Sequence, residues 1–336
     1  MGAVLAGDIG GTKTLLALAQ ADGDLPRIVF EQRYASGGFG DFESMLDTFL
    51  AEARAAGATV EPLDHACFGV AGPIDGRRAK PTYLPWTLDA DRLSQRLGSG
   101  GSTLVNDFAA AAAGVLTLAP DELVTLQAGS PQPHAPRVVV GAGTGLGVAI
   151  LVHGGDRSND DWQVISGEGG HVGFAPGNEE QVELWHCLRQ RHERVTVERV
   201  VCGAGLVDIY RCLVASGRAP DQPDPLLAAD AAAAIAAAAS RQEQTALHAM
   251  RMFVEAYGAF AGDLGLTVMA RGGVFIAGGI APKILPWLSE GPFLAAFNAK
   301  KGHAALTRAM PVFVVTNEKL GLRGAARLAL GAVHGR

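Results

Sequence analysis

An acidic residue and a glycine turn stand between two apolar runs near the start of the chain. The first run, Val4 to Gly7, leads into Asp8 and Ile9, and Gly10-Gly11-Thr12 separates it from a second run, Lys13 to Leu18. Gly-Gly between two strand-like runs predicts a β-hairpin. Backbone N–H groups beside a hydroxyl suit phosphate oxygens, and a carboxylate suits Mg²⁺. A tight hairpin without a ligand explains these residues equally well.

A second glycine turn repeats this arrangement in the middle of the chain. The run Val138 to Val140 enters Gly141 to Gly147 (Gly-Ala-Gly-Thr-Gly-Leu-Gly), and Val148 to Val152 leaves it. Neither turn has the spacing of a P-loop or a dinucleotide motif, because Lys13 follows Thr12 rather than Gly and the glycines of the second turn alternate. The repeat predicts a duplicated architecture in which each half supplies one phosphate-binding turn. Many glycine turns, however, only close hairpins.

Two polar residues follow a short apolar strand in the first third of the chain. The strand Ser102 to Val105 delivers Asn106 and Asp107, and an Ala-rich helix is expected from Phe108 to Leu118. Asn or Asp before such a helix is usually an N-cap. Residues at the carboxyl ends of strands also face the ligand site in α/β folds. One member of the pair can cap the helix while Asp107 points at a substrate.

Three further stretches carry candidate binding residues. Glu168 and His171 stand three apart among glycines, and this mixture of acceptor and donor suits a polyhydroxylated ligand. A third ligand of suitable spacing for a metal ion is missing there, and a satisfied polar loop is the alternative. Glu198 is either a site residue or an acid favoured by a helix dipole. Gly278-Gly279 ends a buried strand, where small residues let a flat base lie against the backbone or simply allow a turn.

The remaining pattern is that of alternating strands and helices. The long apolar helix Glu243 to Leu266 is expected at the centre of the larger domain. The Ala-dominated helix Asp230 to Ser240 shows no functional content and is assigned to the scaffold. The terminal helix Gly324 to Leu330 is expected to pack back across the first domain.

Length, composition and charge limit the classes of protein. The 336 residues suggest about two domains, and 48% hydrophobic residues supply a large core. A formal charge of −6 without a basic block argues against nucleic acid as a partner. Val138 to Gly155 lacks charged residues, but its six glycines favour two strands and a turn over a membrane span.

The cysteines and the N-terminus indicate a cellular compartment. Cys67, Cys187, Cys202 and Cys212 have no paired C-x-x-C spacing, which argues for a reducing compartment and against a zinc knuckle. Asp8 interrupts the first apolar stretch too early for a signal peptide. A soluble cytoplasmic protein without a membrane partner is expected.

Six stretches in order resemble the bacterial glucokinase family of the non-ROK type, within the actin-like ATPase superfamily. The resemblance covers nearly the whole chain and rests on Gly7 to Thr12, Val105 to Phe108, Gly141 to Gly147, Gly167 to Val172, Glu198 to Val200 and Phe275 to Ile280. The family usually has Asn where this chain has Lys13, and Lys is frequent there in the related ROK family. The Cys-rich zinc motif of the ROK family is not found in this sequence.

The resemblance implies a fold and a domain organisation. It implies two actin-like (ribonuclease H-like) α/β domains with a substrate cleft between them. Residues 1–117 plus 317–336 would form the smaller domain, and residues 118–316 the larger one. The resemblance also suggests a homodimer.

The resemblance further implies roles for the candidate residues. Asp107 would be the catalytic base, and sugar hydroxyls would be held by Asn106, Asp107, Glu168, His171 and Glu198. ATP would be bound by Gly7, Asp8, Ile9, Gly10, Gly11, Thr12, Gly143, Thr144, Gly145, Gly278 and Gly279. Asp8 would hold Mg²⁺ directly or through water.

The activity that the resemblance implies is ATP-dependent phosphorylation of glucose at its 6-hydroxyl, feeding glycolysis. A kinase of another hexose on the same fold is the main alternative. A sugar-sensing regulator would carry an N-terminal helix-turn-helix, for which a first strand at about Val4 leaves no room. A plain ATPase has no use for a second polar cluster such as Asn106-Asp107 with Glu168 and His171.

Overall fold

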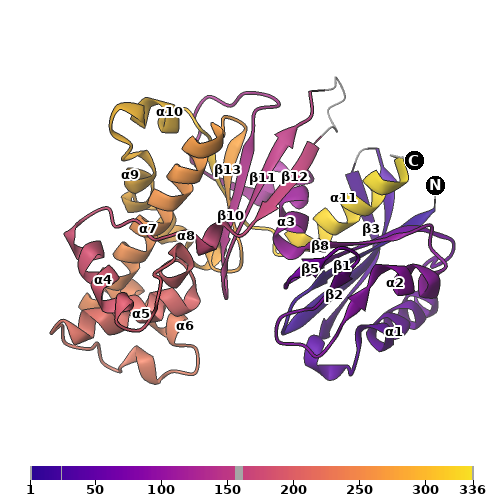
Figure 1. Ribbon diagram of the computed structural model, residues 1–336, viewed down its shortest axis with the longest axis horizontal. Coiled ribbons are helices and arrows are strands. Elements are labelled where there is room, and N and C mark those ends of the chain that lie inside the picture. Colours follow the sequence, from indigo (N-terminus) through magenta and orange to yellow (C-terminus); the bar gives the residue numbers. More distant parts are fainter. Residues whose placement is uncertain (1, 24, 156–161, 335–336) are drawn as a thin grey trace. The chain divides into compact units, whose positions relative to one another are not determined.

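The computed structural model describes residues 2–23, 25–155 and 162–334, which divide into two compact units (Figure 1). The first unit comprises Met1–Pro120, Arg157–Ser166 and Lys319–Arg336, and the second comprises Asp121–Asp156 and Gly167–Glu318. Each unit has its own sheet and its own hydrophobic core, so the two are described separately. Within the described residues, no helix combines the length and the apolar character that crossing a membrane requires.

The first unit is built on a five-stranded mixed sheet of order β3-β2-β1-β4-β8. Its strands are β1 Ala3–Ile9, β2 Lys13–Asp22, β3 Leu25–Ala35, β4 Leu63–Val70 and β8 Ser102–Asn106, and its α-helices are α1 Phe42–Ala55, α2 Ala90–Leu97, α3 Asp107–Val115 and α11 Leu320–His334. A small antiparallel sheet adds β5 Ile74–Asp75, β6 Arg78–Ala79 and β7 Leu88–Asp89. Strand β7 leads directly into α2, which begins at Ala90.

Alternating side chains cover both faces of this sheet. Leu5 and Ile9 of β1 belong to the core formed with α1 and α2, while Val4 and Ala6 face the core that contains α11. This alternation follows from the two-residue period of a strand. The sheet is therefore a buried layer between helices, which is typical of α/β folds.

The C-terminal helix α11 crosses α3 at very short range. A Cβ atom on Gly324 would lie 1.7 Å from the carbonyl oxygen of Ala110, and one on Gly114 would lie 2.2 Å from that of Leu320. Glycine is required at both positions because any side chain would collide with backbone. The prediction that the terminal helix returns to the first domain is confirmed, although α11 is longer than the predicted span.

The second unit contains a six-stranded sheet of order β12-β11-β10-β13-β14-β9. Its strands are β9 Leu123–Gln127, β10 Arg137–Ala142, β11 Leu146–His153, β12 Trp162–Gly167, β13 Gly273–Ala277 and β14 Val312–Val315. Its α-helices are α4 Glu179–Arg189, α5 Gly203–Ala215, α6 Ala231–Ser240, α7 Gln244–Val268, α8 Leu285–Ser289, α9 Pro292–Asn298 and α10 Ala304–Arg308. Most of β12 belongs to the segment Arg157–Ser166, which is assigned to the first unit. The strand is described with the second sheet because its hydrogen bonds are to β11.

The two sheets share one design. In each sheet an antiparallel hairpin, β1–β2 or β10–β11, is followed by two parallel neighbours, β4 and β8 or β13 and β14. The duplicated architecture predicted from the two glycine turns is confirmed. The uncharged stretch from Val138 forms β10 and β11 rather than a membrane span.

One pair of the four cysteines forms a disulfide that their spacing in the sequence did not predict. Cys187 of α4 and Cys212 of α5 form a disulfide, whereas Cys67 and Cys202 are free and buried. The two bonded residues are 25 positions apart on separate helices, so their proximity depends on how α4 packs against α5. Local spacing motifs such as C-x-x-C carry no information about such a pair.

Candidate functional site

The first glycine turn is a hairpin held by a neighbouring serine. The Gly10 N–H donates to the Lys13 carbonyl at 3.0 Å and closes the turn between β1 and β2. Ser36 supports it twice: its Oγ donates to the Gly10 carbonyl at 2.7 Å, and its N–H donates to the Thr12 carbonyl at 3.0 Å. Ser36 is fully buried and also bonds Thr14 Oγ1 at 3.0 Å. The hairpin backbone is therefore fixed without a ligand.

Asp8 places a carboxylate at the carboxyl end of β1. The N-terminal turn of α11 approaches so closely that a Cβ on Gly321 would lie 2.9 Å from Asp8 Oδ2. The pKa of Asp8 is raised to about 6, mainly by burial and also by the negative charge of Asp107, while the positive charge of Lys13 lowers it. At neutral pH the group is thus an ionised carboxylate held at an energetic cost.

Of the pair Asn106 and Asp107, Asn106 is the one that caps the helix. Asn106 is the N-cap of α3, because its Oδ1 accepts from the N–H groups of Phe108 at 2.9 Å and Ala109 at 3.3 Å. This leaves the amide Nδ2 to donate elsewhere. Asp107 is the first residue of α3, and its Oδ1 accepts from the Phe108 N–H at 2.9 Å.

Parallel pairing brings these groups to one edge of the sheet. Ile9 of β1 is in register with Val70 of β4, and Val70 is in register with Asn106 of β8. The carboxyl ends of the three strands therefore lie side by side, which explains why Asp107 acts on the pKa of Asp8. A glycine turn, two carboxylates and an amide share this edge.

The second glycine turn is also a hairpin, anchored by backbone and by a tyrosine. The Gly143 N–H donates to Gly145 O at 2.8 Å, and Gly143 O accepts from the Gly203 N–H at 3.0 Å. Tyr257 of α7 is fully buried; its hydroxyl accepts from the Ala142 N–H at 3.2 Å and donates to Val140 O at 3.3 Å. Sequence reasoning missed this role because Tyr257 follows the apolar spacing of the predicted long helix and gives no other signal.

Glu198 lies against the second turn and beside His171. Its Oε2 accepts from the Leu146 N–H at 2.9 Å, and a Cβ on Gly145 would lie only 2.7 Å from that oxygen. Its Oε1 lies 4.0 Å from His171 Nδ1. Glycine at position 145 is therefore what allows a carboxylate to sit on the turn.

Glu168 is the N-cap, and His171 the last residue, of the short 3₁₀ turn Gly169–His171. The turn fits tightly against β11, since a Cβ on Gly170 would lie 2.2 Å from Leu146 O. The side chains of Glu168 and His171 remain exposed. The structure thus brings His171 and Glu198 together beside the second turn, with Glu168 three residues before His171 on the same 3₁₀ turn.

A cavity of about 900 Å³ opens beside the second turn. Gly143, Thr144 and Gly279 line it, and Gly278 reaches a φ of +82° with Ala142 O close by. The Ala-rich helix, which was expected from the sequence to belong to the scaffold, forms α6 and lines this cavity. Alanine has no functional group, so its sequence could not reveal this role.

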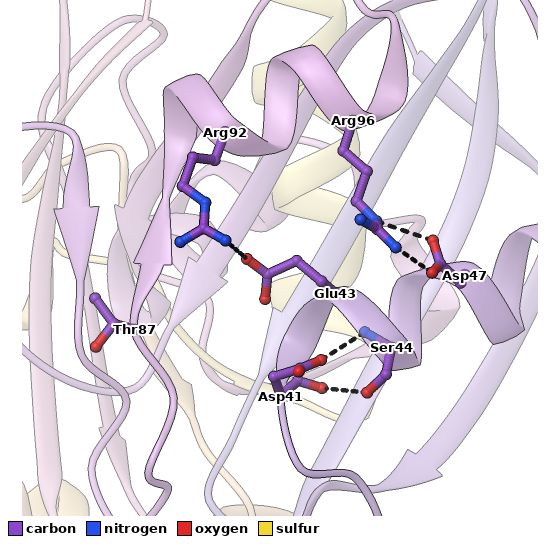
Figure 2. A pocket seen from close by; sticks show the side chains of 7 residues that line it. All are labelled: Asp41, Glu43, Ser44, Asp47, Thr87, Arg92 and Arg96. Carbon is purple, nitrogen blue, oxygen red and sulfur yellow. Dashed lines mark hydrogen bonds and ion pairs between the residues drawn. The ribbon is translucent and has the colours of Figure 1, made fainter.

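A second hollow, in the first unit, contains none of the predicted site residues (Figure 2). It is lined by Asp41, Glu43, Ser44, Asp47, Thr87, Arg92 and Arg96. Arg92 pairs with Glu43 at 3.7 Å, Arg96 pairs with Asp47, and Asp41 caps α1 through the Ser44 N–H. These exposed pairs stabilise the surface only slightly and assign no chemistry to the hollow.

Comparisons with known proteins agree with this architecture. Residues 5–332 match the family model described as glucokinase. A glucokinase of Nostoc sp. (strain PCC 7120) is 40% identical, over 97% of this chain and 98% of that protein.

Solved structures give the same result. The crystal structure of a glucokinase from an Antarctic psychrotroph has a TM-score of 0.84 and 30% identity, covering 98% of this chain and 99% of that one. A ROK family glucokinase from Streptomyces griseus, solved with glucose and AMPPNP, covers 98% of this chain and all of its own, with a TM-score of 0.62. At 23% identity it shows the fold alone.

The two duplicated sheets, each with a glycine hairpin at the carboxyl end of its first strand, define a sugar kinase of the actin-like fold. Within that class, the chain belongs to the glucokinase family. The family and the fold class predicted from the six sequence stretches are confirmed.

Proposed function

We propose that this chain transfers the γ-phosphoryl group of ATP to the 6-hydroxyl of glucose, the reaction named by its family. The observation that carries the proposal is the position of Asp107, at the sheet edge that also holds the first glycine turn and Asp8, in a chain that matches the glucokinase model over residues 5–332. The product, glucose 6-phosphate, would enter glycolysis.

Asp107 is proposed as the catalytic base. A sugar hydroxyl has a pKa far above that of a carboxylate, so Asp107 does not deprotonate it in advance. The carboxylate instead orients the oxygen in line and accepts its proton as the bond to phosphorus forms. Phosphoryl transfer requires mainly this positioning together with stabilisation of charge.

The sugar hydroxyls are proposed to be held by four further residues. Asn106 offers its Nδ2 while its Oδ1 caps α3. Glu168 and Glu198 accept hydrogen bonds, and His171 donates or accepts from one ring nitrogen. A site that pairs each hydroxyl rejects analogues lacking one, because a polar group is then left unpaired.

The nucleotide is proposed to use both hairpins. Backbone N–H groups of Gly7 to Thr12 and Gly143 to Gly145, other than those of Gly10 and Gly143 that close the hairpins, would face the phosphates. Gly278-Gly279 would lie against the nucleoside. Lys13 adds a positive charge close enough to lower the pKa of Asp8. A Lys at this position therefore supports anion binding at the first turn.

Magnesium fits the residues present. Mg²⁺ is usually held by one or two carboxylates together with phosphate oxygens and water, rather than by an all-protein cage. Among the described residues there is no cluster of three or more His, Cys, Asp or Glu, but Asp8 is a half-buried carboxylate whose pKa is raised by burial and by the nearby Asp107. Asp8 would hold the ion, which would neutralise negative charge on the phosphates.

The domain bounds, the assembly and the compartment are proposals drawn from the family. Residues 1–117 with 317–336, and residues 118–316, are the proposed functional domains. A homodimer in the cytoplasm is the proposed working form. Light scattering coupled to size-exclusion chromatography would test the dimer.

A coupled assay of ADP release over a panel of hexoses tests the proposal. Glucose should give the highest kcat/KM, and ATP turnover without sugar should be slow by comparison. Higher kcat/KM with mannose, fructose or an N-acetyl hexose would replace glucose by that sugar. Fast ATP turnover that ignores every sugar would refute a sugar kinase altogether.

A further inference from the structure

The cavity beside the second turn is lined by two sets of side chains of different character. One is the alanine wall, formed by alanines of α6 and by one alanine just before the helix: Ala229, Ala231, Ala232, Ala233, Ala236 and Ala237. The other set consists of the larger apolar side chains Ile280, Ile284, Trp287, Leu206 and Phe253, together with Lys283. Small methyl groups and larger apolar groups around one cavity suit a flat ring.

The buried part of the lining carries no polar side chain among the described residues. Leu206, Phe253 and Ile284 are 5%, 0% and 3% exposed. The hydroxyl, carboxylate and ammonium groups of the lining belong to Thr144, Asp230, Ser240 and Lys283, which are all exposed. They therefore stand where the cavity meets solvent.

Two of these exposed polar groups are engaged by α6 itself. Asp230 Oδ1 caps the helix by accepting from the Ala233 N–H at 3.0 Å, and Ser240 Oγ donates to Ala236 O at 3.0 Å. The carbonyl of Ala237 accepts from the Arg241 N–H at 3.2 Å. The methyl groups of the alanine wall therefore offer surface and shape to a ring, while the side chains of Asp230 and Ser240 are engaged within α6.

We propose that this cavity holds the base of the phosphoryl donor by packing rather than by hydrogen bonds to its edge. The enzyme then accepts purine nucleoside triphosphates as a class, adenine, hypoxanthine and guanine alike. This inference rests on the proposed function, because it assumes that the donor phosphates lie on the second glycine turn.

Physical magnitudes set the expected selectivity. A site that hydrogen-bonds a substrate group rejects the analogue lacking it by about 10⁴-fold or more, whereas an apolar pocket discriminates by only about 10²-fold. A pyrimidine is smaller than a purine and covers less of both sets of side chains. Losing about 40 Å² of buried apolar surface costs roughly 1 kcal/mol, which is about a fivefold loss of affinity.

The test compares four donors with the purified full-length chain at saturating glucose. We expect kcat/KM for ITP and GTP to stay within about 100-fold of the ATP value, and CTP to fall below all three purine nucleotides. ITP is the most direct probe, since it replaces the adenine amino group by a carbonyl. Discrimination of ATP over ITP or GTP by more than 100-fold would show that the base edge is read. A CTP value equal to that of ATP would show that the base is not held at all.

A pair of variants on one helix tests the alanine wall. Ala237→Leu fills the cavity at an exposed position, and leucine is a good helix former, so folding should persist. KM for ATP and ITP should rise together, about tenfold, while KM for glucose stays constant. Ala234→Leu, on α6 but outside the cavity lining, is the matched control and should change neither. An unchanged KM for ATP in Ala237→Leu would overturn the proposal.

Binding measurements separate this inference from the proposed function. If no nucleotide supports phosphorylation of any sugar, the proposed function fails. Calorimetric titration with ATP and ITP still decides the inference, since packing alone predicts dissociation constants within 100-fold of each other. A larger ratio in favour of ATP would reject it independently of catalysis.

Discussion

The two glycine hairpins have the same local design but are stabilised in different ways. The first lies at an edge that carries two carboxylates, Asp8 and Asp107, close enough for one to raise the pKa of the other. The second is held by backbone hydrogen bonds, by the buried hydroxyl of Tyr257 and by one acceptor, Glu198.

This difference separates two requirements of phosphoryl transfer. Beside the first hairpin, the carboxylate of Asp8 is partly buried, which lowers the stability of the fold. Negative charge at this place suits a site that binds a cation and accepts a proton. The backbone of the second hairpin is held in place by hydrogen bonds, and most of the groups that form them are neutral. Duplication of a fold thus preserves geometry while the charges on it diverge.

The largest effect is expected at Asp107. Asp107→Asn keeps an oxygen that can accept from the Phe108 N–H, so α3 should still form, but the proton acceptor is lost. We expect kcat to fall by about 10²–10⁴-fold with a small change in glucose KM. Asp91→Asn, which removes an acid from the first turn of α2, is the control and should keep full activity. Wild-type kcat in Asp107→Asn would remove the catalytic assignment.

Asp8 should show a trade between stability and activity. Its pKa in the folded protein, about 6, lies above the ordinary 3.8, so the folded state binds the proton more tightly than the unfolded chain. This contribution favours folding at low pH and is lost as pH rises through about 6. Asp8→Asn removes the carboxylate charge. We therefore expect the free energy of unfolding at pH 7.5 to be roughly 1–3 kcal/mol higher in the variant than in the wild type.

The stability gain of Asp8→Asn should shrink at pH 4.5, and activity with Mg²⁺ and ATP should be largely lost at every pH. Urea denaturation at the two pH values and the coupled assay measure these effects. Asp22→Asn, at the exposed end of β2, is the control for charge alone. A destabilised Asp8→Asn at pH 7.5 would mean that the carboxylate is stabilised by its surroundings, contrary to this comparison.

Glu198 and Glu168 should differ in stability while agreeing in function. Glu198→Ala leaves the Leu146 N–H without its acceptor, so unfolding free energy should drop by about 1–3 kcal/mol. Glu168→Ala removes an exposed side chain and should leave stability unchanged. Both variants should raise the glucose KM. An unchanged KM in either one would remove that residue from the sugar site.

The smallest effect is expected at Tyr257. Tyr257→Phe deprives the buried Ala142 N–H of its partner, and we expect a loss of about 1 kcal/mol with a few-fold rise in the KM for ATP. Tyr210→Phe is matched, because its hydroxyl accepts from the Asp221 N–H at 2.8 Å elsewhere in the same unit. Tyr210→Phe should lose stability without any change in KM. Equal KM values for the two variants would show that Tyr257 does not position the turn.

The hairpins and the cap of α3 could be predicted because their signals are local. Gly10-Gly11 specifies a turn, and Asn106 specifies a helix cap, whatever the rest of the chain does. Repetition of the hairpin then predicts the duplicated sheet. In each case the residues that specify the feature lie within a few positions of the turn or helix end that they form.

Other features depend on packing that the local sequence does not encode. The alanine wall consists of residues without functional groups, and Tyr257 has the same spacing as core residues of its helix. Cys187 and Cys212 meet only because α4 packs beside α5. The two-residue strands β5, β6 and β7 are too short to show a period.

The crossing of α11 over α3 has a consequence for biosynthesis. The first unit is interrupted in sequence, and its core lacks Leu322, Ala325, Ala326 and Ala329 until the last segment of the chain is available. The second unit is almost contiguous and ends at Glu318. Domains generally fold as they emerge from the ribosome. The first unit, although most of it is translated first, can therefore complete its hydrophobic core only after the second unit has been synthesised.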